Sequence, residues 1–222
     1  MSIEMNYVIC TTPRTRSTVL CDLLVSSDVA GYPREYHEGH ESLKGLDITA
    51  PATYQKYVSV STSPNAVCGI QVMYEKKHIV EKFIDFKNLK CIYLRRENKI
   101  KQAISLLKAI KRNRFYETGE TLKNDGLNQI KITHDEIVYH TFKLTAEDMS
   151  WAHYFQENQI RPLTLWYKDL ETETHQKETF KKVLDFLSIA DTPNEPKVWA
   201  MRQDTDFDKE CYNEIIEKFL PL

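Results

Sequence analysis

A short polar stretch near the N-terminus, residues 11–18, carries side chains suited to binding an anion. It has no large aliphatic residue, and it contains two guanidinium groups, from Arg14 and Arg16. Guanidinium groups are permanently charged and contact oxyanions through two parallel hydrogen bonds. Beyond Thr11, the stretch also offers four hydroxyl groups, from Thr12, Thr15, Ser17 and Thr18. We therefore predict that this loop holds a phosphate or sulfate group.

The residues on either side of the loop indicate how it is positioned. Residues 7–10, YVIC, form an apolar run that favours a buried strand. After the loop, apolar residues return with helical spacing, as Val19, Leu20, Leu23 and Leu24. A strand, a polar loop and a helix start form a common anion site, because the first helical N–H groups and the helix dipole attract negative charge. We expect Ser17 or a neighbouring threonine to cap this helix.

A second cationic pair follows another predicted strand. Arg95 and Arg96 come directly after residues 90–94, KCIYL, and Asn98 is expected to cap the helix that follows. Parallel strands bring their carboxyl ends to one edge of a sheet, where ligands bind. Two cationic strand ends therefore predict a ligand with two separated anionic groups.

The rest of the chain alternates between segments with strand-like and segments with helical patterns of apolar residues. Further strands are predicted at residues 67–73 and 162–166, and helices at 54–58, 78–86, 98–110, 133–158, 180–187 and 215–219. A capping box at residues 133–136 marks the start of the longest helix. This order predicts an α/β fold, a parallel sheet flanked by helices on both faces, in one domain spanning residues 1–222. Segments near 38–65 and 112–132 are expected to serve as acceptor or lid regions.

Bulk properties narrow the classes of function. The net charge of −2 gives no reason to expect nucleic acid as a partner, and no apolar run is long enough to span a membrane. The five cysteines are odd in number and scattered, which predicts a reduced, cytoplasmic protein. Residues 37–40, HEGH, lack the H-E-x-x-H spacing of a zinc site, so we expect no metal.

Two known anion loops can be compared with residues 10–18. The P-loop pattern fails, because the stretch has neither the glycines nor the lysine of that motif. The spacing of Cys10, Arg16 and Ser17 fits a cysteine phosphatase, in which the thiolate is the nucleophile. The loop has no glycine, however, and the chain has no Asp-Pro dipeptide to supply a general acid. A phosphatase and a non-catalytic nucleotide-binding module remain alternatives.

Most of the chain, with gaps around residues 40–65 and 112–132, resembles the sulfotransferases that use 3′-phosphoadenosine-5′-phosphosulfate (PAPS), most closely the bacterial trehalose 2-sulfotransferase family. Residues 12–18, TPRTRST, are similar to that family's 5′-phosphosulfate loop, and residues 31–36, GYPREY, to its Gly-Glu-Pro-Gln-Glu-Phe segment. Residues 69–73 match its next strand loosely, residues 94–109 give the longest match, and weaker similarity covers residues 151–158 and 202–204.

The resemblance implies a P-loop-like sulfotransferase fold and a role for each matched residue. Glu35 corresponds to the catalytic base and Arg14 to the group that holds the sulfuryl and 5′-phosphate oxygens. The implied donor ligands are Thr12, Pro13, Arg14, Thr15, Arg16, Ser17, Thr18, Arg96, Ser105 and Arg202. The implied acceptor contacts are Pro13, Tyr32, Pro33, Arg34, Glu35, Tyr36, His37 and Glu38. The acceptor would be a small-molecule or glycolipid hydroxyl, no metal is needed, and a homodimer is compatible with the family.

Four positions depart from the family pattern. Pro13 and Arg34 each replace a glutamine, Arg16 replaces a small residue that is usually glycine, and Tyr32 replaces an acidic residue. Tyr167, or one of the tryptophans Trp151, Trp166 and Trp199, is a candidate to stack on adenine. The departures concern the acceptor side more than the donor side, so the donor is better predicted than the acceptor.

Overall fold

The fold is built around a four-stranded parallel sheet. A computed structural model of the chain describes residues 6–35, 51–113, 115, 130–190, 194–199 and 206–219. Its strands are β1 (Tyr7–Thr11), β2 (Gly69–Met73), β3 (Lys90–Arg95) and β4 (Leu163–Trp166), in the order β2-β1-β3-β4. Every pair is parallel, which confirms the predicted α/β class.

The strand order fixes where a ligand can bind. The chain leaves β1 toward β2 on one side and leaves β3 toward β4 on the other. The carboxyl ends of these strands are in register, since Thr11 lies opposite Met73 and Leu94, and Arg95 lies opposite Trp166. The crevice between β1 and β3 is therefore the topological switch point, where open α/β sheets bind ligands. Both predicted cationic segments begin at this crevice.

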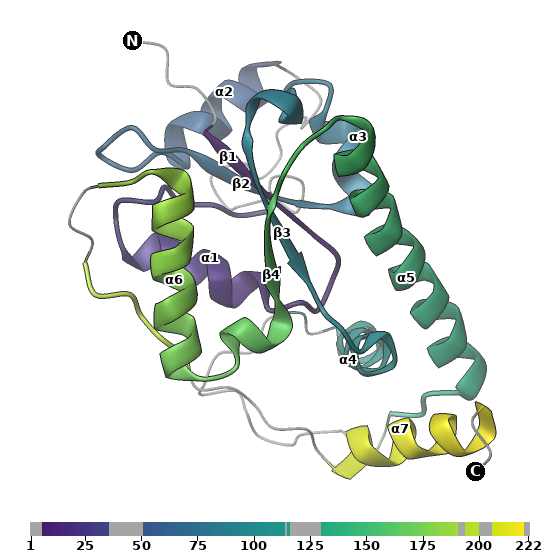
Figure 1. Ribbon diagram of the computed structural model, residues 1–222. Helices are drawn as coiled ribbons and strands as arrows, with labels where there is room; N and C mark the ends of the chain where they lie inside the picture. Colours follow the sequence, from purple (N-terminus) through teal and green to yellow (C-terminus); the bar gives the residue numbers. More distant parts are fainter. Residues whose placement is uncertain are drawn as a thin grey trace.

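Helices cover both faces of the sheet, as predicted (Figure 1). One face, which carries Tyr7 and Ile9 of β1, packs against α1 (Ser17–Ser26) and α6 (Glu173–Leu187). The other face, which carries Val8 and Cys10, packs against α2 (Pro51–Val60), α3 (Lys77–Val80) and α5 (His134–Glu157). The alternation along β1 follows from the two-residue period of a strand, and it buries both sides of the central strand.

A third apolar cluster lies beyond the sheet edge. It joins α4 (Lys99–Arg112), α5 and α7 (Asp206–Phe219), with Ile104 and Ile215 among its buried residues. This cluster fixes α4 at the carboxyl end of β3, so that one face of α4 meets the loop after β1.

The start of two helices was predicted correctly, and a third helix was not. Thr133 and Glu136 form the capping box of α5, and Asn98 accepts the N–H of Lys101 at the start of α4. The helix predicted at 78–86 is wrong: α3 ends at Val80, between the short 3-10 turns η2 (Tyr74–Lys76) and η3 (Phe86–Asn88). A further 3-10 turn, η5 (Tyr167–Leu170), follows β4 directly.

All five cysteines are buried free thiols, so none forms a disulfide. Within the described ranges, no helix combines the length and the apolar character needed to cross a membrane.

Candidate functional site

The loop between β1 and α1 is shaped by two arginines with left-handed backbones. Arg14 has φ 65° and Arg16 has φ 71°, a region that glycine adopts without strain and other residues enter at a cost of about 1–2 kcal/mol. Arg16 stands where the resembling family usually has a small residue, most often glycine, so in this chain the left-handed position carries a charged side chain. Arg16 is also the N-cap of α1, and no side chain caps the helix. The predicted cap at Ser17 or a neighbouring threonine is therefore wrong.

An uncapped helix start suits an anion. The first amides of a helix have no partner within the helix, and here they follow directly on the cationic loop. The first turn of α1 contains no acidic residue that would compete for them. This turn and the loop before it can therefore donate several N–H groups to one bound anion.

The four loop hydroxyls do different things. Thr15 is buried, lies 2.6 Å from Thr11 Oγ1 and donates to the carbonyl of Thr12 at 3.1 Å, so its side chain holds the loop itself. Thr12 Oγ1 accepts a hydrogen bond from Gln102 at 2.9 Å, and Ser17 Oγ accepts one from Gln71 at 3.0 Å. Thr18 is exposed on the first turn of α1.

The structure brings Arg14, Arg96 and Ser105 together. Arg14 Nε donates to Ser105 Oγ at 3.1 Å, and Arg14 Nη1 donates to the carbonyl of Phe115 at 2.8 Å. Arg96 is buried and its Nη1 lies 3.3 Å from the carbonyl of Arg14. The residues that resemblance assigns to the two ends of the donor thus form one continuous polar cluster across the switch-point crevice.

Tyr167 separates two of the arginines. The guanidinium carbon of Arg16 lies 3.7 Å from the centre of the Tyr167 ring, and that of Arg96 lies 4.0 Å from it. Both distances are too short for an edge contact, and two guanidinium groups so close to one centre would overlap on one face. They must therefore lie on opposite faces of the ring. Because both faces are covered, Tyr167 is not the residue that stacks on adenine in this conformation.

Arg95 belongs to a different network from its neighbour. Its guanidinium binds the buried carboxylate of Asp148 at 2.7 Å, and Lys99 lies 3.2 Å from the same oxygen. Tyr93 also donates to this carboxylate. Burial alone would raise the pKa of Asp148, but the hydrogen bond from Arg95 and the charge of Lys99 outweigh burial and lower it. Only Arg96 of this pair turns toward the loop, and the resemblance assigns a donor role to Arg96 and none to Arg95.

Glu35 lies beside the start of α1. It forms an isolated bridge with Gln71 of β2, and its carboxylate accepts a hydrogen bond from Gln71 Nε2 at 2.7 Å. The same nitrogen reaches Ser17 Oγ. Gly31 has φ 73°, and a Cβ atom at this position would lie only 2.9 Å from the carbonyl oxygen of Val67, so only glycine fits this turn. The extended segment that follows this turn runs parallel to β2 at the edge of the sheet, where the carbonyl of Arg34 accepts the N–H of Gln71.

Arg34 and Tyr32, just before Glu35, have partners of their own. Arg34 forms a 2.9 Å ion pair with Asp22 of α1, and the hydroxyl of Tyr32 bonds to Asp28. Burial raises the pKa of Asp22, and the Arg34 charge opposes that shift. Tyr32 and Arg34 line a cavity of about 210 Å³ together with Val25, Tyr57, Val60 and Ser61. This volume is smaller than an ordinary ligand pocket, so it does not define an acceptor site by itself.

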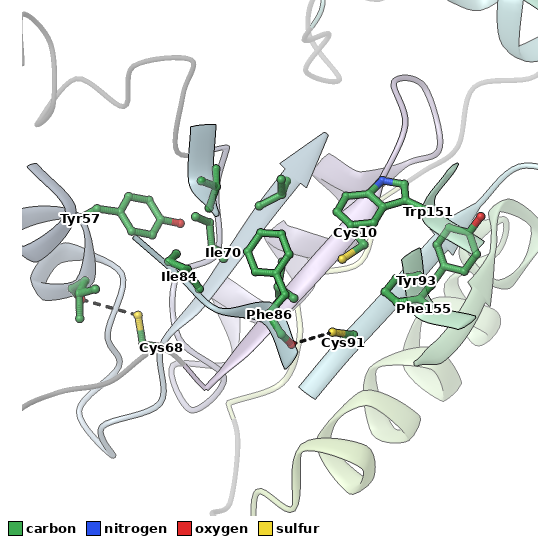
Figure 2. Close-up of a cluster of buried hydrophobic side chains, with 14 residues drawn as sticks. Cys10, Tyr57, Cys68, Ile70, Ile84, Phe86, Cys91, Tyr93, Trp151 and Phe155 are labelled. Carbon is green, nitrogen blue, oxygen red and sulfur yellow. Dashed lines mark hydrogen bonds between the residues drawn. The ribbon is translucent and has the colours of Figure 1, made fainter. Parts of the chain in front are cut away.

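Cys10 is poorly placed to be a nucleophile. It points into the core among Trp151, Tyr93 and Cys91, as Figure 2 shows, and it is fully buried. Burial raises the pKa of Cys10 well above its ordinary value, which keeps the thiol protonated. The geometry therefore argues against the phosphatase alternative. Trp151, in the same cluster, is a core residue whose indole N–H donates to the carbonyl of Thr11.

Several predicted site residues lie outside the described residues. These are Tyr36, His37, Glu38 and Arg202, together with much of the two expected lid segments. Among the residues that are described, no group of three His, Cys, Asp or Glu side chains is placed to hold a metal ion.

Gln71 and Gln102 are site residues that sequence reasoning did not single out. Gln71 is the lone polar residue of the strand GIQVM, and Gln102 is a polar residue in the otherwise mostly apolar buried stripe of α4. A buried polar residue is the informative exception in such a pattern, and that was the available signal.

A parallel sheet with a polar, cationic loop at its switch point is an arrangement typical of ligand-binding α/β proteins. The family model described as Stf0 sulphotransferase matches residues 6–76 and 71–206. The chain belongs to this sulfotransferase family. None of the curated proteins matches it significantly.

A solved structure agrees with the fold. The chain is similar to the sulfotransferase from Alicyclobacillus acidocaldarius, with a TM-score of 0.53 and 13% identity, over 96% of this chain and 91% of that one. At this identity the likeness concerns the fold.

Proposed function

We propose that this protein transfers a sulfuryl group from PAPS to a hydroxyl group of a small or carbohydrate-type acceptor, with Glu35 as the base. Membership of the sulfotransferase family supports sulfuryl transfer in general. The observation that carries the finer proposal is the position of Glu35. Its carboxylate is one side-chain amide away from Ser17, the first residue of the helix whose amides face the anion loop.

The donor side has groups that fit both anionic ends of PAPS. The loop amides, Arg14 and the Ser17 hydroxyl suit the 5′-phosphosulfate, while Arg96 and Ser105 suit a 3′-phosphate nearby. Arginine guanidinium groups at such positions neutralise charge on the leaving phosphate, which is the main need of group transfer of this type. The left-handed backbone at Arg14 and Arg16 turns the loop so that it can surround one anion.

The acceptor side needs a base and a route to sulfur. Glu35 takes the acceptor's proton while the acceptor oxygen forms a bond to sulfur, and the bond from sulfur to the 5′-phosphate oxygen breaks. The products are the sulfate ester and adenosine 3′,5′-bisphosphate. A carboxylate next to an anion site repels the anionic donor, so its presence there favours a role as the base. Gln71 offsets part of this repulsion by donating a hydrogen bond to the carboxylate.

The acceptor itself is proposed only by chemical class, as a sugar or glycolipid hydroxyl. The replacements at Pro13, Tyr32 and Arg34 lie at positions proposed to contact the acceptor, and Arg34 is bound to Asp22 rather than directed at the site. The acceptor is therefore expected to differ from trehalose.

The experiment is mass spectrometry of acceptor pools incubated with the protein and PAPS. A product heavier by one sulfate, absent without PAPS, supports the proposal. Tight binding of adenosine 3′,5′-bisphosphate without any transfer would instead support a non-catalytic nucleotide-binding module. Hydrolysis of a generic aryl phosphate would favour the phosphatase alternative, against the burial of Cys10.

A further inference from the structure

Two buried glutamines flank the anion loop, one on each side. Gln102, on α4, has no exposed surface, and Gln71, in the middle of β2, is 3% exposed. Buried amide groups are almost always hydrogen-bonded, because an amide that leaves water without gaining a protein partner destabilises the fold by its desolvation free energy. In both side chains the amide nitrogen and the amide oxygen form hydrogen bonds, and each amide nitrogen donates one of these bonds to a hydroxyl group at the loop.

The orientation of Gln102 follows from its neighbours. Its Nε2 donates to Thr12 Oγ1 at 2.9 Å and to the carbonyl of Pro13 at 2.6 Å, while its Oε1 accepts from Lys99 Nζ at 3.2 Å. A flipped amide would set its oxygen against the Pro13 carbonyl and its NH₂ against the lysine ammonium. The surroundings therefore allow only the observed orientation. Lys99 is itself held by Asp148, so this orientation is anchored to α5.

Gln71 is oriented in the same way on the other side. Its Nε2 donates to Ser17 Oγ at 3.0 Å and to Glu35 Oε1 at 2.7 Å, while its Oε1 accepts from the thiol of Cys21 at 3.0 Å. A flip would place the amide oxygen against the Glu35 carboxylate. Burial raises the pKa of Cys21 to about 12, so the thiol keeps the proton that it donates.

A hydroxyl that accepts from an amide keeps its own proton for another acceptor. Thr12 and Ser17 are 1% and 5% exposed, so bulk water reaches them poorly. Within the described part of the chain neither hydroxyl donates to a protein acceptor. We propose that Gln71 and Gln102 are positioning residues that turn the Ser17 and Thr12 hydroxyl protons toward the sulfate or phosphate oxygens bound in the loop. This inference rests on the proposed function, since it takes the 5′-phosphosulfate loop as the binding site.

The test is a pair of double-mutant cycles on the affinity for adenosine 3′,5′-bisphosphate, measured by calorimetry. Thr12→Val removes the hydroxyl at nearly constant size, and Gln102→Met removes the amide. Each change is expected to weaken binding roughly 10- to 100-fold, the effect of losing one hydrogen bond to a charged group. If Gln102 acts through Thr12, the double variant binds about as weakly as Thr12→Val alone.

The second cycle pairs Ser17→Ala with Gln71→Met. The same non-additivity is expected for affinity, and Gln71→Met should also slow sulfate transfer because Gln71 contacts Glu35. The matched control is Gln176→Met. Gln176 is another fully buried glutamine, but its amide bonds to Trp199 and Leu170 instead of the loop. This control should lower the melting temperature and leave the nucleotide affinity unchanged.

The outcomes separate the inference from the proposed function. The positioning role would be overturned if, in both cycles, the losses of affinity in the two single variants add up in the double variant. An unchanged affinity in Thr12→Val and Ser17→Ala would also overturn it. Either result would hold even if the wild-type protein transfers sulfate. If a glutamine variant does not fold, these two hydroxyl variants alone decide. A wild-type protein that does not bind the nucleotide would overturn the donor proposal and this inference together.

Discussion

Glu35 and Ser17 are linked through a single nitrogen atom, because Gln71 Nε2 lies 2.7 Å from the Glu35 carboxylate and 3.0 Å from the Ser17 hydroxyl. Glu35 lies in the loop after α1, and Ser17 is the first residue of α1. Gln71 belongs to β2, whose five residues are all buried. It therefore ties the proposed base to the first residue of the helix that follows the proposed anion loop.

Adenosine 3′,5′-bisphosphate is expected to stabilise the protein more than AMP does. Arg96 and Ser105 lie next to Arg14, so a 3′-phosphate gains charge-assisted hydrogen bonds that AMP cannot make. By linkage, the tighter ligand raises the melting temperature more at equal concentration. Thermal shift assays with both nucleotides measure this, and Ser105→Ala should reduce the difference. Equal shifts in the wild-type protein would remove the case for a 3′-phosphate site.

Tyr167→Leu is expected to weaken nucleotide binding, whereas Tyr167→Phe is expected to keep most of it. The ring lies between the guanidinium groups of Arg16 and Arg96, and cation–π contacts of this kind contribute about 0.5–2 kcal/mol each. Phenylalanine keeps the aromatic faces, and leucine does not. Calorimetric titration of the two variants provides the comparison. If leucine and phenylalanine bind the nucleotide equally well, the ring does not hold the arginines in place.

Cys10→Ser is expected to cost stability and to leave sulfate transfer measurable. The thiol lies in a closely packed apolar cluster, and a hydroxyl buried there without a good partner costs about 1–3 kcal/mol (Figure 2). Urea unfolding and a transfer assay on the same preparation test both halves of the prediction. A phosphate-ester hydrolysis that disappears only in Cys10→Ser would contradict it.

Asp148→Asn is expected to destabilise the protein by about 3 kcal/mol near neutral pH, because Arg95 and Lys99 lose their shared carboxylate. The pKa of Asp148 is lower in the folded protein than in the unfolded chain. The carboxylate therefore stabilises the fold above its unfolded pKa, and this contribution is lost as the pH falls through the lowered folded pKa. The difference in free energy of unfolding between wild type and variant, measured with urea, should therefore decrease in acid. A difference that stays constant would show that charge is not the cause.

Local patterns were enough to predict the strands of the sheet and the strand and helix on either side of the proposed anion loop. Period and residue type in residues 7–24 already indicate a strand, an anion loop and a helix, because these features depend on near neighbours. Local pattern did not distinguish Arg95 from Arg96, since the partner that binds Arg95, Asp148, is 53 residues away, and only the family resemblance singled out Arg96. The N-cap was mispredicted for a similar reason. The Ser17 hydroxyl accepts a hydrogen bond from Gln71 of β2, which is distant in the sequence, and Arg16, with a left-handed backbone, occupies the N-cap position.

The roles of the two glutamines depend on three-dimensional detail. An amide can donate or accept, and only the neighbours of Gln71 and Gln102 decide which atom faces the loop. No periodicity carries that information. Family resemblance assigned a role to Glu35 but not the contact that orients it.

Glu35→Gln is the most direct test of the account. The change keeps the size and one acceptor oxygen but removes the basicity. Adenosine 3′,5′-bisphosphate should bind nearly as before, or slightly more tightly because a negative charge is gone. Single-turnover transfer from PAPS, measured on the same preparation, should fall by about 10²- to 10⁴-fold, the usual range for a lost general base. A variant that binds the nucleotide and transfers sulfate at the wild-type rate would contradict the account and make His37 the next candidate for the base.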